Sequence, residues 1–149
     1  MKPGNCAIIA ITKHGVSIGE TLGRNLEGTI YTLKKFADRF AGQEPEILPQ
    51  PFSKELGSLW KRHDCLIFII SVGAVVRMIA PLLENKKTDP AVICIDDKAQ
   101  FAISLLSGHV GQANDYTSEV ARVLSATPVI TTASDVQDTL RVDILGTHL

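Results

Sequence analysis

The stretch from Ser104 to Asn114 holds the residue types most often used for catalysis. Gly108 and Gly111 flank His109 at the point where an apolar, strand-like pattern gives way to a helical one. A histidine at such a junction can accept or donate a proton near neutral pH, and backbone amides together with an asparagine amide can stabilise an oxyanion. We therefore predict an acid–base site with His109 and Asn114 as its catalytic residues.

Two alternatives apply to this stretch. A lone histidine is more often structural than catalytic, although glycines on both sides argue against burial inside a core element. Ser107 could act as a nucleophile, but Ser-Gly-His is not the GxSxG pattern of a nucleophile elbow. We assign Ser107, Gly108 and Gly111 to substrate binding.

Two further loops carry basic residues after apolar runs. Lys13 and His14 precede a helical pattern whose first amides could help to hold a carboxylate or phosphate. Gly73 and Arg77 follow another buried run, and the Arg77 guanidinium could bind a carboxylate with two donors. Both loops could also be ordinary turns with solvated side chains. Neither contains GxGxxG or GxxxxGK[ST], so dinucleotide and P-loop sites are not predicted.

A fourth polar loop follows the last apolar run. Thr131, Thr132 and Asp135 offer hydroxyls and a carboxylate to a polar ligand, although capping of a following helix is the favoured role for Asp135. His63 and His148 lie in polar helical contexts and are expected to be exposed. The four histidines show no metal-ligand spacing such as HxxxH, so no metal site is predicted.

Strand and helix patterns alternate along the chain, and these elements must position the polar loops. Continuous apolar runs are typical of strands that are covered on both faces of a parallel sheet. Strands are expected at 6–11, 29–33, 65–70, 91–95, 101–105 and 128–132, and helices at 16–26, 53–63, 74–83, about 112–124 and 138–149.

Three details refine this pattern. Segment 34–51, which contains three prolines, is expected to be a long loop with one helical turn. Ser53 is the expected N-cap of the helix that follows. Pro81 within a helical pattern predicts a break near Ala80.

The alternation predicts one α/β domain over 1–149 with a doubly wound, flavodoxin-like or Rossmann-like sheet. The sheet should be mostly parallel, with one antiparallel hairpin strand within 91–105. In such sheets ligands bind beyond the carboxyl ends of the strands, at the switch point. The four polar loops are therefore expected to converge on one edge of the sheet.

Composition restricts the class of partner. Lys and Arg number 15 against 16 Asp and Glu, so no overall field favours nucleic acid or an anionic membrane. The first apolar run is too short for a signal peptide or a membrane span. Three cysteines in or beside apolar runs favour a reducing compartment. We expect a cytoplasmic protein that binds neither nucleic acid nor membrane.

Three blocks of the chain resemble the amino-terminal part of the cobalt-precorrin-5A hydrolase, or CbiG, family. They are VGAVVRMIAPLLENKKTDPAV from Val72, ISLLSGHVGQAN from Ile103 and ATPVITTASD from Ala126, while IIAITKHGV from Ile8 matches more loosely. The combined blocks are specific; the Ser-Gly-His-x-Gly run alone is not.

The resemblance implies a role in the anaerobic pathway of cobalamin synthesis, with cobalt carried by the substrate and no separate cofactor. The family hydrolyses cobalt-precorrin-5A to cobalt-precorrin-5B, opening a δ-lactone and releasing acetaldehyde. For this reaction we hypothesise that His109 acts as the base, that Asn114 stabilises charge, and that Lys13 and Arg77 hold carboxylates of the macrocycle.

Family members commonly continue into middle and carboxyl-terminal domains that this chain lacks, so we expect a fragment or a separately encoded subunit. The alternative function is a non-catalytic tetrapyrrole-binding or assembly domain that needs a carboxyl-terminal partner.

Overall fold

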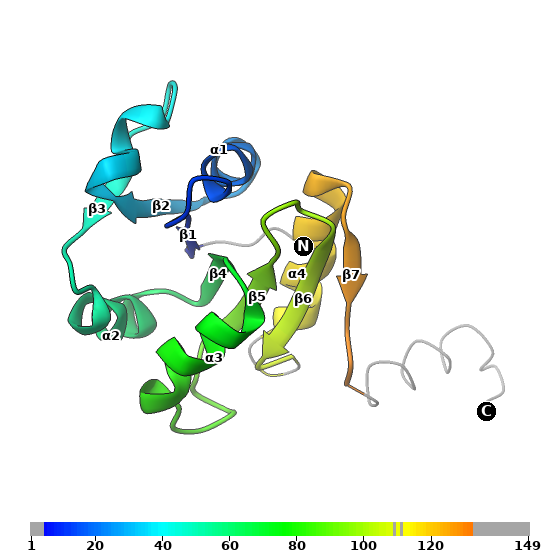
Figure 1. Cartoon of the computed structure of the whole chain (residues 1–149). Helices are drawn as coiled ribbons and strands as arrows, with labels where there is room; N and C mark the ends of the chain where they lie inside the picture. The colour runs from blue at the N-terminus through cyan, green and yellow to red at the C-terminus, as the bar shows by residue number, and fades with distance from the viewer. Residues whose placement is uncertain (1–4, 109, 111, 133–149) are drawn as a thin grey trace, which may run out of the picture.

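The structure of the protein, a computed structural model, describes residues 5–108, 110 and 112–132. Its centre is one seven-stranded sheet with the order β3-β2-β1-β4-β5-β6-β7 (Figure 1). The strands are β1 (Cys6–Ile9), β2 (Gly28–Leu33), β3 (Glu46–Leu48), β4 (Cys65–Ile69), β5 (Ala91–Ile95), β6 (Phe101–Leu106) and β7 (Thr127–Val129).

The first five strands run in one direction, and the last two run in the other. All the pairs from β3 across to β5 are parallel, whereas β5 and β6 are antiparallel, and β7 is parallel to β6. We call the side where β1 to β5 end the carboxyl edge and the side where they begin the amino edge. Because Val92 near the start of β5 pairs with Leu106 at the end of β6, β6 and β7 end at the amino edge.

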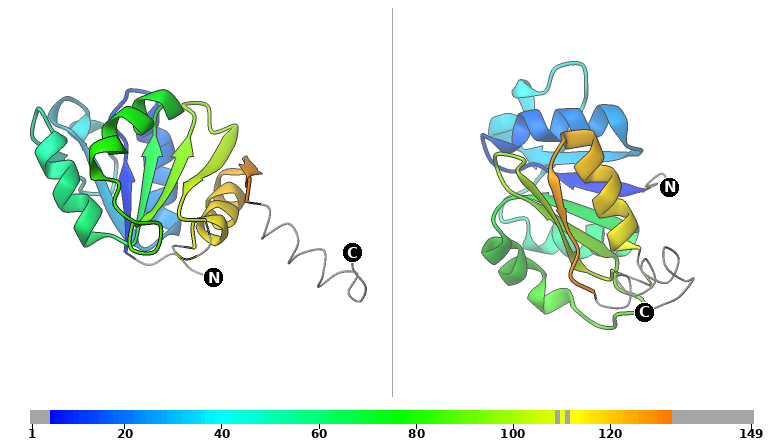
Figure 2. Two further views of the ribbon diagram at one scale, coloured as in Figure 1. Left: turned by 90° about the horizontal axis from the view of Figure 1, so that it is seen from below. Right: turned by 90° about the vertical axis from the view of Figure 1, so that its right-hand side faces the viewer.

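Helices cover both faces of the sheet. Helices α1 (Gly15–Asn25) and α4 (Ala113–Leu124) pack side by side on one face, and α2 (Ser53–Arg62) and α3 (Val72–Ile79) lie on the other (Figure 2). Two short 3₁₀ helices, η1 (Lys34–Arg39) and η2 (Ala80–Leu82), follow β2 and α3. This two-sided cover explains the continuous apolar character of the central strands.

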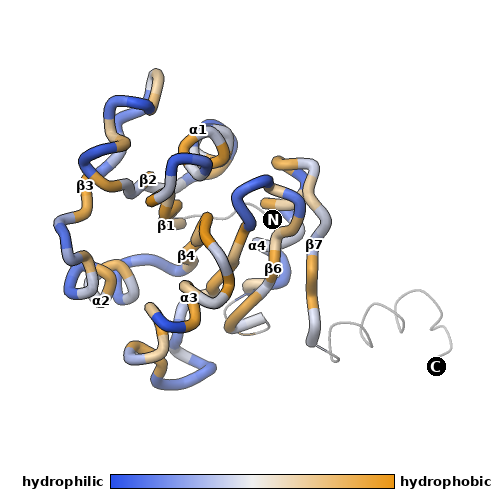
Figure 3. Tube along the Cα trace, in the orientation of Figure 1, coloured by the Kyte–Doolittle hydropathy of each residue, from blue (hydrophilic) through white to orange (hydrophobic). Residues whose placement is uncertain are grey.

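The core is centred on the three strands β1, β4 and β5, every residue of which is buried. Phe68 in β4 is one of the largest fully buried side chains. Hydrophobic residues gather in these strands, while the segment between η2 and β5 is hydrophilic (Figure 3). The burial of apolar side chains in these strands is the main contribution to the stability of the fold.

The structure confirms the predicted fold class and several local expectations. The sheet is doubly wound and mostly parallel, with the hairpin of β5 and β6 as its antiparallel pair. The helix containing Pro81 breaks at Ala80, where α3 ends and η2 begins with the proline in its first turn. A proline there removes one amide donor and excludes a continuous helix.

Two local expectations were wrong. The helical turn expected within segment 34–51 is present as η1, but the edge strand β3 also lies there, so the rest of the segment is not simply a loop. Three residues with only Leu48 buried give too weak a pattern to predict a strand beside prolines. Ser53 is not the N-cap of α2: Phe52 takes that position without a side-chain hydrogen bond, and Ser53 is already helical.

Candidate functional site

The structure divides the predicted site between opposite edges of the sheet. The loops after β1 and β4 lie at the carboxyl edge, where strand order reverses between these two neighbours. The loops after β6 and β7 lie at the amino edge, since both strands run in the opposite direction. The expectation that all four loops converge was therefore wrong.

At the carboxyl edge, Lys13, His14, Gly73 and Arg77 are all exposed. Thr12 closes the turn before α1, because its carbonyl and its Oγ1 each accept from the Gly15 amide at 3.1 Å. Lys13 and His14, between these two residues, are exposed at the switch point, where ligands bind in open α/β sheets.

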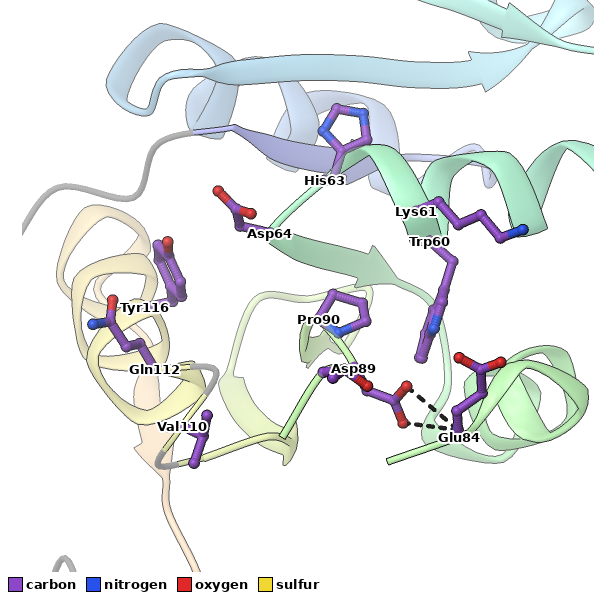
Figure 4. Close-up of a pocket in the computed structure, with 11 residues that line it drawn as sticks. Trp60, Lys61, His63, Asp64, Glu84, Asp89, Pro90, Val110, Gln112 and Tyr116 are labelled. Atoms are coloured by element: carbon purple, nitrogen blue, oxygen red, sulfur yellow. Dashed lines mark hydrogen bonds between the residues drawn. The ribbon is translucent and has the colours of Figure 1, made fainter. Parts of the chain in front are cut away.

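At the amino edge, a cavity of about 450 Å³ opens between α2, β4, β5 and α4 (Figure 4). We call it the amino-edge cavity. Its volume lies within the range of small-molecule sites, roughly 300–1,000 Å³. It is lined by Trp60, Lys61, His63, Asp64, Glu84, Thr88, Asp89, Pro90, Val110, Gln112 and Tyr116.

Carboxylates dominate the charge of the amino-edge cavity. Asp64, Glu84 and Asp89 line the cavity together with one lysine, Lys61. Asp89 is buried, and both its oxygens accept from the Glu84 amide, at 3.3 and 3.1 Å. The cavity therefore favours neutral or cationic groups over carboxylates.

Tyr116 contributes a neutral phenol to the amino-edge cavity. Burial, followed by nearby negative charge that includes the Asp64 carboxylate, raises the pKa of Tyr116 to about 12. The phenol therefore stays protonated at neutral pH and can donate a hydrogen bond.

Val110 and Gln112, which follow β6 in the chain, line one side of this cavity. Ser107 and Gln112 have φ of 62° and 65°, a left-handed conformation that is uncommon without glycine. The Ala113 amide donates to the Ser107 carbonyl at 3.0 Å, and the Ser107 hydroxyl donates to the Asp89 carbonyl at 3.1 Å. Residues in a left-handed conformation that is held by surrounding hydrogen bonds, as at Ser107 and Gln112, are typical of functional sites.

Asn114 is buried beneath this loop rather than exposed in the cavity. Its Oδ1 accepts from the Ser104 hydroxyl at 2.6 Å, and its Nδ2 donates to Thr132 Oγ1 at 2.8 Å. The structure thus brings together two predicted residues, Asn114 and Thr132, while Thr131 beside them is exposed. The predicted residues His109, Gly111 and Asp135 lie outside the described part of the chain.

His63 is buried, so the expectation that it is exposed was wrong. Its Nδ1 must donate to the Asn5 carbonyl, 3.2 Å away, because a carbonyl only accepts. The neutral ring then accepts at Nε2 from the Tyr31 hydroxyl at 2.7 Å. Sequence alone could not place a partner that lies 32 positions away.

This burial predicts that stability depends on pH. Desolvation is the main cause that lowers the pKa of His63 from 6.5, and the nearby Arg62 charge acts in the same direction. As the pH falls through 6.5, the unfolded chain binds a proton before the folded chain does, so the free energy of unfolding should decrease. The free energy of unfolding should level off once the pH is below the pKa of His63 in the folded protein. Urea denaturation between pH 5 and 8 measures this, and His63→Gln should reduce the slope; an unchanged slope would exclude His63 as its source.

The family comparison identifies the kind of domain. The model of the family described as cobalamin synthesis G N-terminal matches residues 54–135, more than half of the chain. This chain belongs to that family. All the side chains that line the amino-edge cavity lie within the cobalamin synthesis G N-terminal match.

Relatives extend the match to nearly the whole chain. A cobalt-precorrin-5A hydrolase from Priestia megaterium is 54% identical over 96% of this chain and 39% of its own length. Another from Salmonella typhimurium is 38% identical over 100% of this chain and 41% of its own length. The chain thus spans about two fifths of the length of the curated relatives that it matches.

A solved structure supports the fold assignment. A homologue of cobalamin biosynthesis protein G from Sulfolobus solfataricus is 26% identical, with a TM-score of 0.64 over 95% of this chain and 44% of that chain. Among the described residues, no group of three or more His, Cys, Asp or Glu could hold a metal ion. Nor does any helix in this part of the chain have the length and apolar character of a membrane span.

Sequence reasoning missed most of the cavity of this cobalamin synthesis G N-terminal domain. Asp64 immediately precedes the buried run of β4, and Asp89 lies two residues before β5. Polar residues before buried strands mark the amino edge, but the usual ligand rule directs attention to the other edge. Only the reversed direction of β6 brings its loop to these residues.

Proposed function

We propose that this chain is the amino-terminal part of a cobalt-precorrin-5A hydrolase of cobalamin biosynthesis. The reaction would open the δ-lactone of cobalt-precorrin-5A and release acetaldehyde to give cobalt-precorrin-5B. The observation that carries this proposal is the 54% identity to the P. megaterium relative over nearly the whole chain. Cobalt belongs to the substrate, and no further cofactor is required.

We place the reacting part of the substrate at the amino-edge cavity. Its carboxylates, Asp64 and Glu84, would repel the carboxylate side chains of the corrinoid but not its neutral lactone. The lactone would therefore enter the cavity while the charged side chains remain outside. A volume of about 450 Å³ suits one part of a macrocycle rather than the whole molecule.

His109 is our proposed general base. It lies in the chain between Gly108 and Val110, and Val110 lines the amino-edge cavity. A base there would activate water for attack on the lactone carbonyl, and backbone amides of the same loop would stabilise the oxyanion. Ser107 and Gly108 would contact the substrate from this loop.

A second candidate function is tetrapyrrole binding or assembly without catalysis. The positive charge at the carboxyl edge favours this function. Exposed Lys13 and Arg77 lie at this edge, and Lys34 and Lys35 line a cavity of about 690 Å³ at the ends of β2 and β3. These cations could hold the carboxylates of a corrinoid. A ligand bound there would be separated by the length of the strands from Val110 and Gln112, which line the amino-edge cavity. Catalysis would then require a partner, such as the rest of the relatives' chain.

Acetaldehyde release distinguishes the two functions. We define the chimeric enzyme as the P. megaterium relative in which this chain replaces the matched region. Release by the chain alone from cobalt-precorrin-5A would support a complete catalytic site. Release by the chimeric enzyme but not by the chain would support the need for a partner, and release by neither would contradict the hydrolase proposal.

Cellular location follows as part of the same proposal. The three cysteines are free and buried, as is typical of proteins from reducing compartments. A pathway enzyme that acts on a soluble corrinoid would work in the cytoplasm.

A further inference from the structure

Asn114 occupies a position where three segments of the chain meet. Its side chain is 5% exposed, at the start of α4. The amide oxygen contacts Ser104 in β6, and the amide nitrogen contacts Thr132 after β7. The amide thus links β6 and the segment after β7 to the start of α4.

The same amide packs directly on Gly108. A Cβ atom at position 108 would lie 3.0 Å from Asn114 Oδ1, 3.2 Å from Nδ2 and 3.2 Å from Thr132 Cγ2. The Asn114 backbone amide also donates to the Gly108 carbonyl at 3.2 Å. Since Gly108 does not have a positive φ, glycine is required here for space rather than for backbone conformation.

These contacts determine where the next described residues of the loop lie. Val110 and Gln112 follow Gly108 and line the amino-edge cavity. Both hydrogen-bonding groups of the Asn114 amide already have protein partners, and the side chain is buried. The amide is therefore built to hold the loop rather than to contact a ligand in the cavity.

We propose that Asn114 is a positioning residue which, with Ser104 and Thr132, fixes the wall of the amino-edge cavity through Gly108. This inference rests on the proposed function only for its effect on turnover. It replaces the predicted role of Asn114 as an oxyanion donor and that of Thr132 as a substrate ligand.

The first test compares Asn114→Leu with Thr132→Val in the chimeric enzyme. Leucine keeps a similar volume but removes the bonds to Ser104 and Thr132, and valine removes the bond between positions 114 and 132 from the other side. Thr132→Val should lower kcat by about tenfold, the scale of one lost buried hydrogen bond, Asn114→Leu should lower it at least as much, and the double variant should be no worse than Asn114→Leu. Thr127→Val, an exposed threonine in β7, is the matched control and should match the unsubstituted enzyme.

A direct catalytic role would give a different result. If Asn114→Leu lowers kcat while Thr132→Val leaves kcat and KM unchanged, Asn114 acts on the substrate itself and the proposal is wrong.

The second test does not depend on activity. Amide hydrogen exchange in this chain should become about tenfold faster at Gly108, Val110 and Gln112 in both variants, with the amides of β1 and β4 unchanged. Unchanged exchange at the three loop amides would overturn the proposal. Faster exchange without acetaldehyde release from the chimeric enzyme would contradict the hydrolase function while supporting the positioning role.

Discussion

Replacing His109 with alanine in the chimeric enzyme is expected to lower kcat for acetaldehyde release by about 10²–10⁴-fold, the usual contribution of a general base. Lactone opening needs an activated water, and His109 is the proposed base in the loop beside the amino-edge cavity. Steady-state assays of acetaldehyde across pH 5 to 9 measure the effect. The acidic limb of the pH profile should disappear in the variant.

Lys98→Ala is the control for this prediction. Lys98 is exposed in the turn between β5 and β6, at the carboxyl edge, so its loss should leave turnover unchanged. Turnover within twofold of the unsubstituted enzyme after His109→Ala would remove the histidine from the mechanism. Another base would then be sought among the cavity side chains, with Asp64 as the first candidate.

Replacing Phe68 with alanine is expected to lower the free energy of unfolding by roughly 3–5 kcal/mol, the usual cost of removing a buried phenylalanine ring. Phe68 is fully buried in β4, where it pairs with Ile9 of β1 and Cys94 of β5. The lost ring would leave a cavity among three strands that cannot move independently. Urea denaturation followed by circular dichroism measures this change.

Phe101→Ala provides a matched control in the same sheet. Phe101 is 45% exposed in β6, so its loss should cost less than half as much as that of Phe68. Equal costs at the two positions would contradict the assignment of the core to β1, β4 and β5.

Most of the architecture could be predicted because it depends on local pattern. Runs such as Cys65–Ile69 are apolar throughout, and a strand covered on both faces needs that composition. The break at Ala80 followed from the chemistry of Pro81 alone. The edge strand β3 was missed because it buries only Leu48, which gives no periodic signal.

The site could be predicted only in part, because its assembly depends on strand direction. The antiparallel hairpin of β5 and β6 was expected, but it is incompatible with the expected convergence of all four loops on one edge. A strand that reverses direction carries its carboxyl-end loop, here Ser107 to Gln112, to the opposite edge. The burial of His63 could not be predicted from the sequence either, because it depends on contacts with Tyr31 and Asn5 from other parts of the chain.

The two outermost strands have a consequence for solubility. β7 contains Pro128, and β3 lies between Pro45 and Pro49. A proline offers no amide hydrogen to a neighbouring strand, and edge strands with free amides can pair between molecules and cause aggregation. The prolines therefore restrict growth of the sheet from one molecule into the next at both of its margins, and substituting them would favour association through the strand edges.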